Sequence, residues 1–165
     1  MFDITQSQRL AERYLTRPAG RARRSDAGRS RLPAPVLAEI RAAATGFGRP
    51  SMAGLQGRLA TLCAEKGLRP PSRASLYAAF DSIEGDVYQI STLPPAAGDC
   101  LYNLPSDGMV PGRQLVFSCL NYGSLAAMSF AAGLPWLDLH QARLVRGWRP
   151  RSHGLLLALL RVRGG

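Results

Sequence analysis

The chain has 165 residues, of which 46% are hydrophobic, and its formal net charge at pH 7 is +10. This length allows one ordinary domain or two small ones, and the apolar content is sufficient for a buried core. No apolar run approaches the roughly 18 residues that suggest a membrane span, and the polar residues near Met1 do not resemble a signal peptide. We therefore expect a cytoplasmic protein that does not cross a membrane.

The positive charge is concentrated towards the two ends of the sequence. Residues 1–32 contain eight arginines and three acids, whereas residues 143–165 contain six arginines and no acid. Arginine keeps its charge and forms paired hydrogen bonds with phosphate. This distribution favours a polyanionic partner, with nucleic acid ahead of a membrane surface.

The first 32 residues are expected to form a basic arm. A short helix is predicted over Gln6–Tyr14, and residues 16–31 follow it as an Arg-, Gly-, Ala- and Ser-rich segment without apolar periodicity. One interpretation is an arm that tracks the DNA backbone, and the other is a solvated tail. In the first case the phosphate contacts are assigned to Arg21, Arg23 and Arg24.

Residues 33–94 are predicted to form a helix-turn-helix-like domain of three helices. The helices are expected at Pro33–Ala44, Ser51–Lys66 and Ser72–Asp81, where serine caps begin the second and third. An extended segment, Val87–Ile90, follows and could be the strand of a wing. Three helices are the minimal core of a helix-turn-helix domain, although a generic helical hairpin fits the same pattern.

The third helix is the predicted recognition helix. Its Leu76 and Phe80 are four residues apart and are expected to face the core. Its other side is expected to approach DNA, with base-edge contacts from the first turns and phosphate contacts from the preceding turn. The nucleic-acid contacts predicted on this unit are Arg69, Ser72, Arg73, Ser75 and Tyr77.

Residues 95–165 are predicted to form a helical C-terminal region. The helices are expected at Ala96–Leu104, Gln114–Leu120, Leu125–Ala132, Trp136–Arg146 and Ser152–Val162, and of these Gln114–Leu120 also fits a strand, although we favour a helix. The third and fourth of these fit a second helix-turn-helix in their spacing, but we favour an ordinary hairpin with Trp136 and Trp148 as core anchors. The last helix is apolar around most of its circumference, so it should be buried in this core or against another copy or partner.

A second group of basic residues surrounds Trp148. Arginines interleaved with an aromatic side chain can bind phosphate and stack on bases. The nucleic-acid contacts predicted in this group are Arg146, Arg149 and Arg151.

Little in the sequence indicates catalysis, and we predict that the protein is not an enzyme and has no cofactor or metal. The two histidines have no acidic pair at metal-ligand spacing, and no phosphate-binding loop follows a strand. Asp81, Glu84 and Asp86 could in principle serve a metal-dependent nuclease, but an acidic turn is more often solvated. The three cysteines lack a CxxC pair and lie in apolar surroundings, which predicts buried free thiols.

Two stretches carry a family resemblance. Residues 32–93, and above all Gly67-Leu-Arg-Pro-Pro-Ser-Arg-Ala-Ser-Leu-Tyr77, resemble a winged helix-turn-helix domain. Residues 111–135 are similar to the part of AbiEi-type antitoxin regulators that follows their winged helix. The resemblance implies autoregulation of an operon and neutralisation of a toxin.

The sequence thus predicts a mainly α protein with a winged-helix-like helix-turn-helix domain and a helical C-terminal half. The expected function is DNA-binding transcriptional regulation, with double-stranded DNA as partner and a toxin or other protein as a second one. A homodimer is also expected, because DNA readers are commonly two-fold. The alternatives are a module that docks an acidic partner protein and an RNA-binding protein.

Overall fold

The computed structural model describes residues 32–164, and this part of the chain folds into eight α-helices and one two-stranded sheet. In chain order the elements are α2 (Ala34–Ala44), α3 (Met52–Glu65), α4 (Arg73–Ser82), β1 (Val87–Gln89), the 3-10 helix η1 (Ile90–Thr92), α5 (Pro95–Gly98), the 3-10 helix η2 (Asp99–Leu101), β2 (Met109–Pro111), α6 (Gly112–Tyr122), α7 (Leu125–Gly133), α8 (Trp136–Ala142) and α9 (Pro150–Arg163). The mainly helical class is confirmed. The helix predicted at Gln6–Tyr14 lies outside the described residues.

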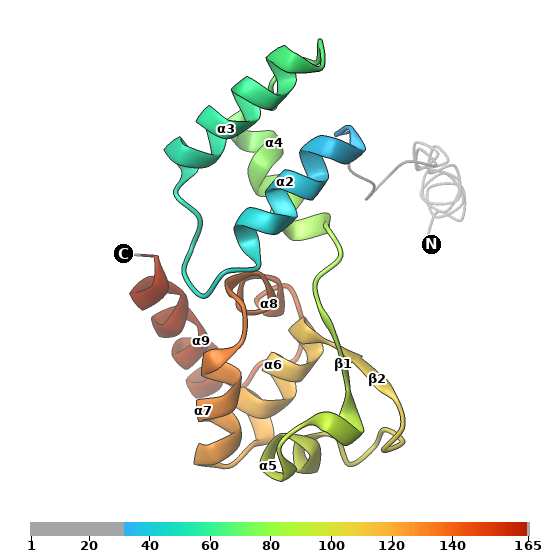
Figure 1. The fold of residues 1–165 in the computed structure, drawn as a ribbon. Helices are drawn as coiled ribbons and strands as arrows, with labels where there is room; N and C mark the ends of the chain where they lie inside the picture. The colour runs from blue at the N-terminus through green and yellow to red at the C-terminus, as the bar shows by residue number, and fades with distance from the viewer. Residues whose placement is uncertain (1–31, 165) are drawn as a thin grey trace, which may run out of the picture.

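Figure 1 shows the helices in two groups that meet at α8. The group of α2, α3 and α4 lies at the top of the view, α5, α6 and α7 lie below α8, and α9 lies to the left of α8. No helix in residues 32–164 is long and apolar enough to cross a membrane.

Serine caps begin three of the helices, as their sequences predict. The hydroxyl oxygens of Ser51, Ser72 and Ser124 accept hydrogen bonds from the backbone N–H three residues later, at 3.3, 3.1 and 3.4 Å. Each bond satisfies a donor that the first turn of a helix leaves unpaired. After α3 the chain turns at Gly67, whose φ of 63° is in the left-handed region that glycine tolerates.

The core of the first group is formed where α2 packs against both α3 and α4. Leu76 and Phe80 of α4 are buried, as predicted, and the indole of Trp136 meets the Phe80 ring edge-on at 5.2 Å between centroids. Trp136 and Leu137 belong to α8, so this cluster takes part of its core from the C-terminal region.

The second group is centred on α6, which is buried along most of its length and packs against α7, α8 and α9. The opposite side of α8 contributes Leu139 and Ala142 to this second cluster. Because α8 supplies buried side chains to both clusters, it joins the two groups of helices. Cys63, Cys100 and Cys119 are buried free thiols, which confirms that prediction.

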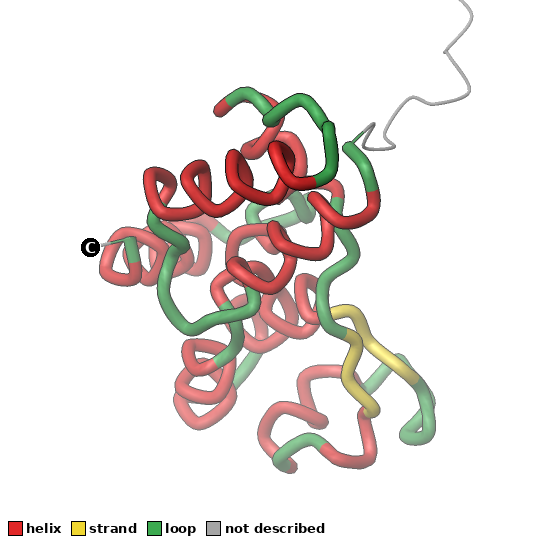
Figure 2. The backbone as a smooth tube through the Cα atoms, turned by 45° about the horizontal axis from the view of Figure 1, so that its top comes forward, coloured by secondary structure: helices red, strands yellow, loops and turns green. Residues whose placement is uncertain are grey.

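The sheet joins segments on both sides of residue 94, where the sequence indicates the end of the first domain. β1 confirms the predicted strand, and it pairs antiparallel with β2, with Tyr88 opposite Val110. The connection between the strands, residues 90–108, carries η1, α5 and η2 rather than a tight turn. Figure 2 shows the two strands side by side at one edge of the molecule.

Three C-terminal helices differ from their predictions. The helix predicted at Ala96–Leu104 is instead the short α5 followed by the 3-10 helix η2, which ends at Leu101. The helix predicted from Trp136 to Arg146 ends at Ala142, where the indole N–H of Trp148 donates to the Ala142 carbonyl at 3.1 Å. Gly147, with φ of 92°, then turns the chain towards α9. In α9 Leu156 is buried but Val162 is 80% exposed, so this chain's own core covers only one face of the helix.

Candidate nucleic-acid interface

The outer face of α4 carries polar residues at helical spacing. Arg73, Tyr77 and Asp81 are four residues apart and therefore lie along one side of the helix. The buried residues Leu76, Ala79 and Phe80 lie on the adjoining side, and Tyr77 packs partly against this core. Burial of one side of so short a helix fixes the direction in which the other side faces.

Tyr77 lies between two arginines on this face. Arg49, from the segment between α2 and α3, donates a hydrogen bond from Nη2 to the Tyr77 hydroxyl at 2.9 Å. The guanidinium carbons of Arg49 and Arg73 are each 6.0 Å from the centre of the Tyr77 ring. Hydrogen bonding from Arg73, together with the positive charge of both arginines, lowers the pKa of Tyr77 from its ordinary value. The result is a half-buried tyrosine flanked by two exposed arginines.

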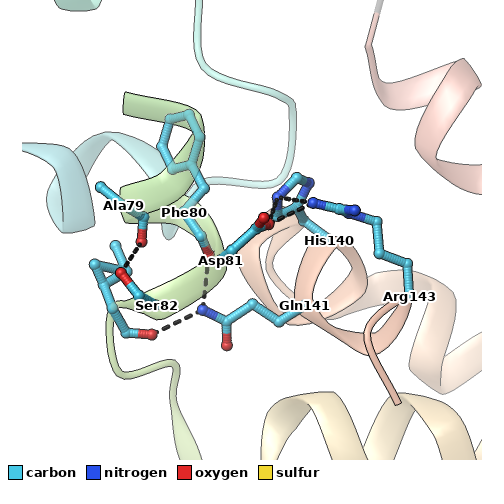
Figure 3. A network of polar contacts seen from close by, with 8 residues as sticks. Ala79, Phe80, Asp81, Ser82, His140, Gln141 and Arg143 are labelled. Atoms are coloured by element: carbon cyan, nitrogen blue, oxygen red, sulfur yellow. Dashed lines mark hydrogen bonds and ion pairs between the residues drawn. The ribbon is translucent and has the colours of Figure 1, made fainter. Parts of the chain in front are cut away.

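The C-terminal end of the same face is occupied by an ionic cluster, shown in Figure 3. Asp81 Oδ1 lies 2.9 Å from His140 Nε2 and also accepts a hydrogen bond from Arg143 Nη2. The His140 ring stacks on Trp136 with centroids 4.5 Å apart. Its burial, and then the charge of Arg143, lower the pKa of His140, although Asp81 opposes the shift. The Asp81 carboxylate is therefore already paired with His140 of α8 and with Arg143, the residue that follows α8.

The three carboxylates considered for a metal-dependent nuclease do not share a site. Asp81 is held as above, and Asp86 pairs with Arg41 at 3.4 Å. Within residues 32–164 no group of three histidines, cysteines or carboxylates is arranged to hold a metal ion.

The remaining residues predicted on this unit lie at or before the beginning of α4. Arg69 is exposed in the turn between α3 and α4, residues 66–72. The Ser72 hydroxyl accepts from the Ser75 backbone N–H, and the two hydroxyl oxygens are 2.9 Å apart. Ser72 is thus primarily a cap, and the Ser75 hydroxyl is partly engaged by it.

The second predicted group is not on this face. Arg149 donates from Nη1 to the Asn121 carbonyl at 3.1 Å, and its guanidinium lies 4.7 Å from the Tyr122 ring centre. Arg149 precedes the first residue of α9, whereas the Arg163 carbonyl at the far end of α9 accepts from the Arg49 backbone N–H at 3.0 Å. A helix of this length spans roughly 20 Å at about 1.5 Å per residue, so the two arginine groups are separated.

The other members of this group are also located away from α4 or in the core. Arg146 and Arg151 are exposed, whereas Trp148 is half-buried and meets the Phe117 ring edge-on at 4.9 Å. Trp148 therefore serves as a core anchor, as Trp136 does. The arm arginines Arg21, Arg23 and Arg24 lie outside the described residues.

Sequence reasoning did not assign two residues that complete the α4 face. Arg49 comes from a loop that carries no helical pattern, so only the fold brings it to Tyr77. Arg143 was noted as one of several basic residues, but its pairing with Asp81 depends on the packing of α8 against α4.

No protein-family model, no curated protein and no solved structure matches this chain. Its function is therefore inferred from its own residues.

Proposed function

We propose that the protein binds double-stranded DNA through the outer face of α4 and acts as a transcriptional regulator. The observation that carries this proposal is the Arg49–Tyr77–Arg73 group, in which two exposed arginines flank a half-buried tyrosine of a short, serine-capped helix. A helix of this kind fits the width of the major groove.

The chemistry of the group suits the two kinds of contact that DNA offers. Arg73 in the first turn can form paired hydrogen bonds with the edge of a guanine. Arg69, before the helix, and Arg49, beside it, are suited to phosphate oxygens, which position a protein on the duplex. The pairing of Asp81 with Arg143 reduces the repulsion that its negative charge would exert on the DNA backbone.

The arrangement of the helices is helix-turn-helix-like rather than typical. The segment between α3 and α4 spans residues 66–72 and is longer than the three or four residues usual for the motif. In this proposal β1, which follows α4, takes the place of the wing strand.

The test compares Arg73→Ala with Arg161→Ala, an exposed arginine of α9 that has no assigned role. Duplexes selected by the wild-type protein from a random library provide the specific target, and unselected duplexes provide the nonspecific one. Arg73→Ala should weaken binding to the selected duplex by about tenfold to a hundredfold, which corresponds to the 1–3 kcal/mol of one base contact. Equal losses on both duplexes, or equal losses for both variants, would contradict the recognition-helix assignment.

A second candidate is docking of an acidic partner protein, which in an antitoxin regulator would be the toxin. The separate group at Arg149 and Arg151 favours it, because these arginines lie away from α4. Weak DNA binding at physiological salt, together with a protein that co-purifies only with wild type and not with Arg149→Ala, would support this candidate over DNA binding.

A further inference from the structure

A cavity lies between the end of α6 and the beginning of α9, with a residue of α7 in its wall. Its volume is about 640 Å³, within the range of small-ligand sites. No residue of α4 lines it, so it is separate from the Arg49–Tyr77–Arg73 group. Its lining includes Asn121, Tyr122, Met128, Arg149, Arg151 and Ser152.

Arg149 is held in a fixed orientation at this cavity. Its backbone N–H donates to Asn121 Oδ1 at 2.9 Å, and its Nη1 donates to the Asn121 carbonyl at 3.1 Å. Asn121 is only 3% exposed, and its Nδ2 donates to the Gly147 carbonyl at 3.2 Å. The guanidinium also lies 4.7 Å from the centre of the Tyr122 ring, a distance at which a cation is attracted to an aromatic face. An arginine fixed in this way loses little conformational freedom when it binds an anion.

The charge of Arg149 has no counterion in the described part of the chain. A guanidinium has several N–H donors, and within residues 32–164 that of Arg149 donates to a single acceptor, the Asn121 carbonyl. Arg151 lines the same cavity and is exposed. Neither arginine forms an ion pair within residues 32–164, and residues 143–165 contain no acid. An anion bound at the cavity would take up the free donors and reduce the repulsion between the two cations.

The beginning of α9 adds to this positive potential. The helix starts with Pro150, and no side chain caps it, so the backbone N–H groups of Arg151 and Ser152 have no intrahelical acceptor. Such groups favour negative charge nearby. They reinforce the two arginine side chains, which supply the full charges.

The rest of the lining indicates what the anion is attached to. Tyr122 is 53% exposed, and Met128 and Pro150 line the cavity with it. A thioether and a tyrosine ring both make favourable contacts with an aromatic ring. An inorganic anion would leave this apolar surface uncovered. A carboxylate suits the site better than a doubly charged phosphate, because an apolar lining makes removal of each further charge from water costly.

We propose that this cavity binds a small aromatic carboxylic acid in its ionised form. The carboxylate is placed at Arg149 and Arg151, and the aromatic ring on Tyr122 and Met128. The site does not depend on the proposed DNA binding through α4. It shares its two arginines with the surface that would dock an acidic partner protein, so a bound acid and such a partner would compete.

The test is an NMR titration of the ¹⁵N-labelled full chain with phenylacetate and two analogues, at physiological salt and without DNA. Phenylacetamide has nearly the same shape but no charge, and acetate keeps the charge but lacks the ring. Phenylacetate should bind at least about tenfold more tightly than either analogue, because each loses one part of the contact. Its largest amide shifts should fall on residues 121–128 and 149–153. No saturable shifts up to about 10 mM phenylacetate, or equal affinity for either analogue, would overturn the proposal.

Three arginine variants with the same net charge locate the carboxylate. Arg149→Gln and Arg151→Gln each remove a cation from the cavity, whereas Arg161→Gln removes one roughly 15 Å from Arg151 along α9, at about 1.5 Å per residue. Each of the first two should reduce phenylacetate affinity by about fivefold to tenfold and leave phenylacetamide affinity unchanged, and the third should change neither. Unchanged phenylacetate affinity in both cavity variants, or an equal loss in Arg161→Gln, would overturn the placement of the carboxylate.

Met128→Ala tests the apolar part of the site, and alanine is compatible with its position in α7. It should weaken binding of phenylacetate and phenylacetamide alike, because both lose the contact with the thioether. Unchanged affinity for both would overturn the placement of the ring. The assay contains no DNA and its variants leave α4 intact, so a failure here is distinct from a failure of the proposed DNA binding.

Discussion

The carboxyl group of Asp138 is buried without full hydrogen bonding, and this predicts how stability depends on pH. The residue is 1% exposed, and burial raises the pKa of Asp138 from 3.8 to about 6, although the Tyr88 hydroxyl favours the charged form. The substitution Asp138→Asn keeps an oxygen to accept from Tyr88. It replaces the other oxygen with a neutral amide nitrogen, so the side chain no longer titrates.

The sign of the effect follows from which state holds the proton. Between pH 3.8 and about 6 the folded protein keeps a proton on Asp138 that the unfolded chain has released. Proton release therefore favours unfolding, and the free energy of unfolding falls as the pH rises through this window. The pKa difference of about 2 units corresponds to roughly 3 kcal/mol at about 1.4 kcal/mol per unit.

Urea denaturation of both proteins between pH 3 and pH 8 measures this contribution. The free energy of unfolding of Asp138→Asn minus that of wild type should rise by about 3 kcal/mol from the acid end to pH 8. The other titrating groups cancel in this difference, so they do not obscure the result. Curves that stay parallel over the whole range would refute the burial of an uncompensated carboxyl group at this position.

Three further predictions concern single residues. Ser72→Ala should lower the free energy of unfolding by about 1 kcal/mol in urea denaturation, because the Ser75 N–H loses its cap acceptor; no change would mean that water replaces the cap fully. Gly112→Ala should lower the free energy of unfolding by about 3 kcal/mol or more, since its methyl carbon would lie 2.2 Å from the Asp138 carboxyl carbon. Adding Asp138→Ala to this variant should restore part of the lost stability. By NMR titration His140 should have a pKa below 6.5, and Arg143→Gln should raise it; a value above 6.5 in wild type would contradict the burial of its ring. Because the unfolded chain then takes up the proton more readily, His140 makes stability fall as the pH drops below 6.5.

Local signals in the sequence predict most of the helices. Serine caps and the glycine after α3 act within a few residues, so Ser51, Ser72, Ser124 and Gly67 locate helix ends without knowledge of the fold. There are two exceptions: the helix predicted at Ala96–Leu104 is divided into α5 and η2, and the predicted continuation of α8 to Arg146 is wrong. Its end depends on the Trp148 indole, which bonds to a carbonyl only after the chain has turned back.

The candidate site could be predicted only in part. The spacing of Arg73 and Tyr77 identifies one face of α4, since residues four apart share a side of a helix. Arg49 and His140 reach that face through the packing of distant segments, which no local pattern encodes. The unpaired Asp138 Oδ1 was not predicted at all, because a buried oxygen without a partner is recognisable only when its neighbours are known.

The central claim, that α4 carries the DNA-binding surface, is tested most directly by NMR. Amide chemical shifts of the ¹⁵N-labelled protein are recorded as a selected duplex is added at physiological salt. The largest changes should fall on Arg49 and on residues 69–78, with smaller ones elsewhere. Changes confined to residues 146–152, or loss of all changes at physiological salt, would contradict the claim and assign the positive charge to another partner.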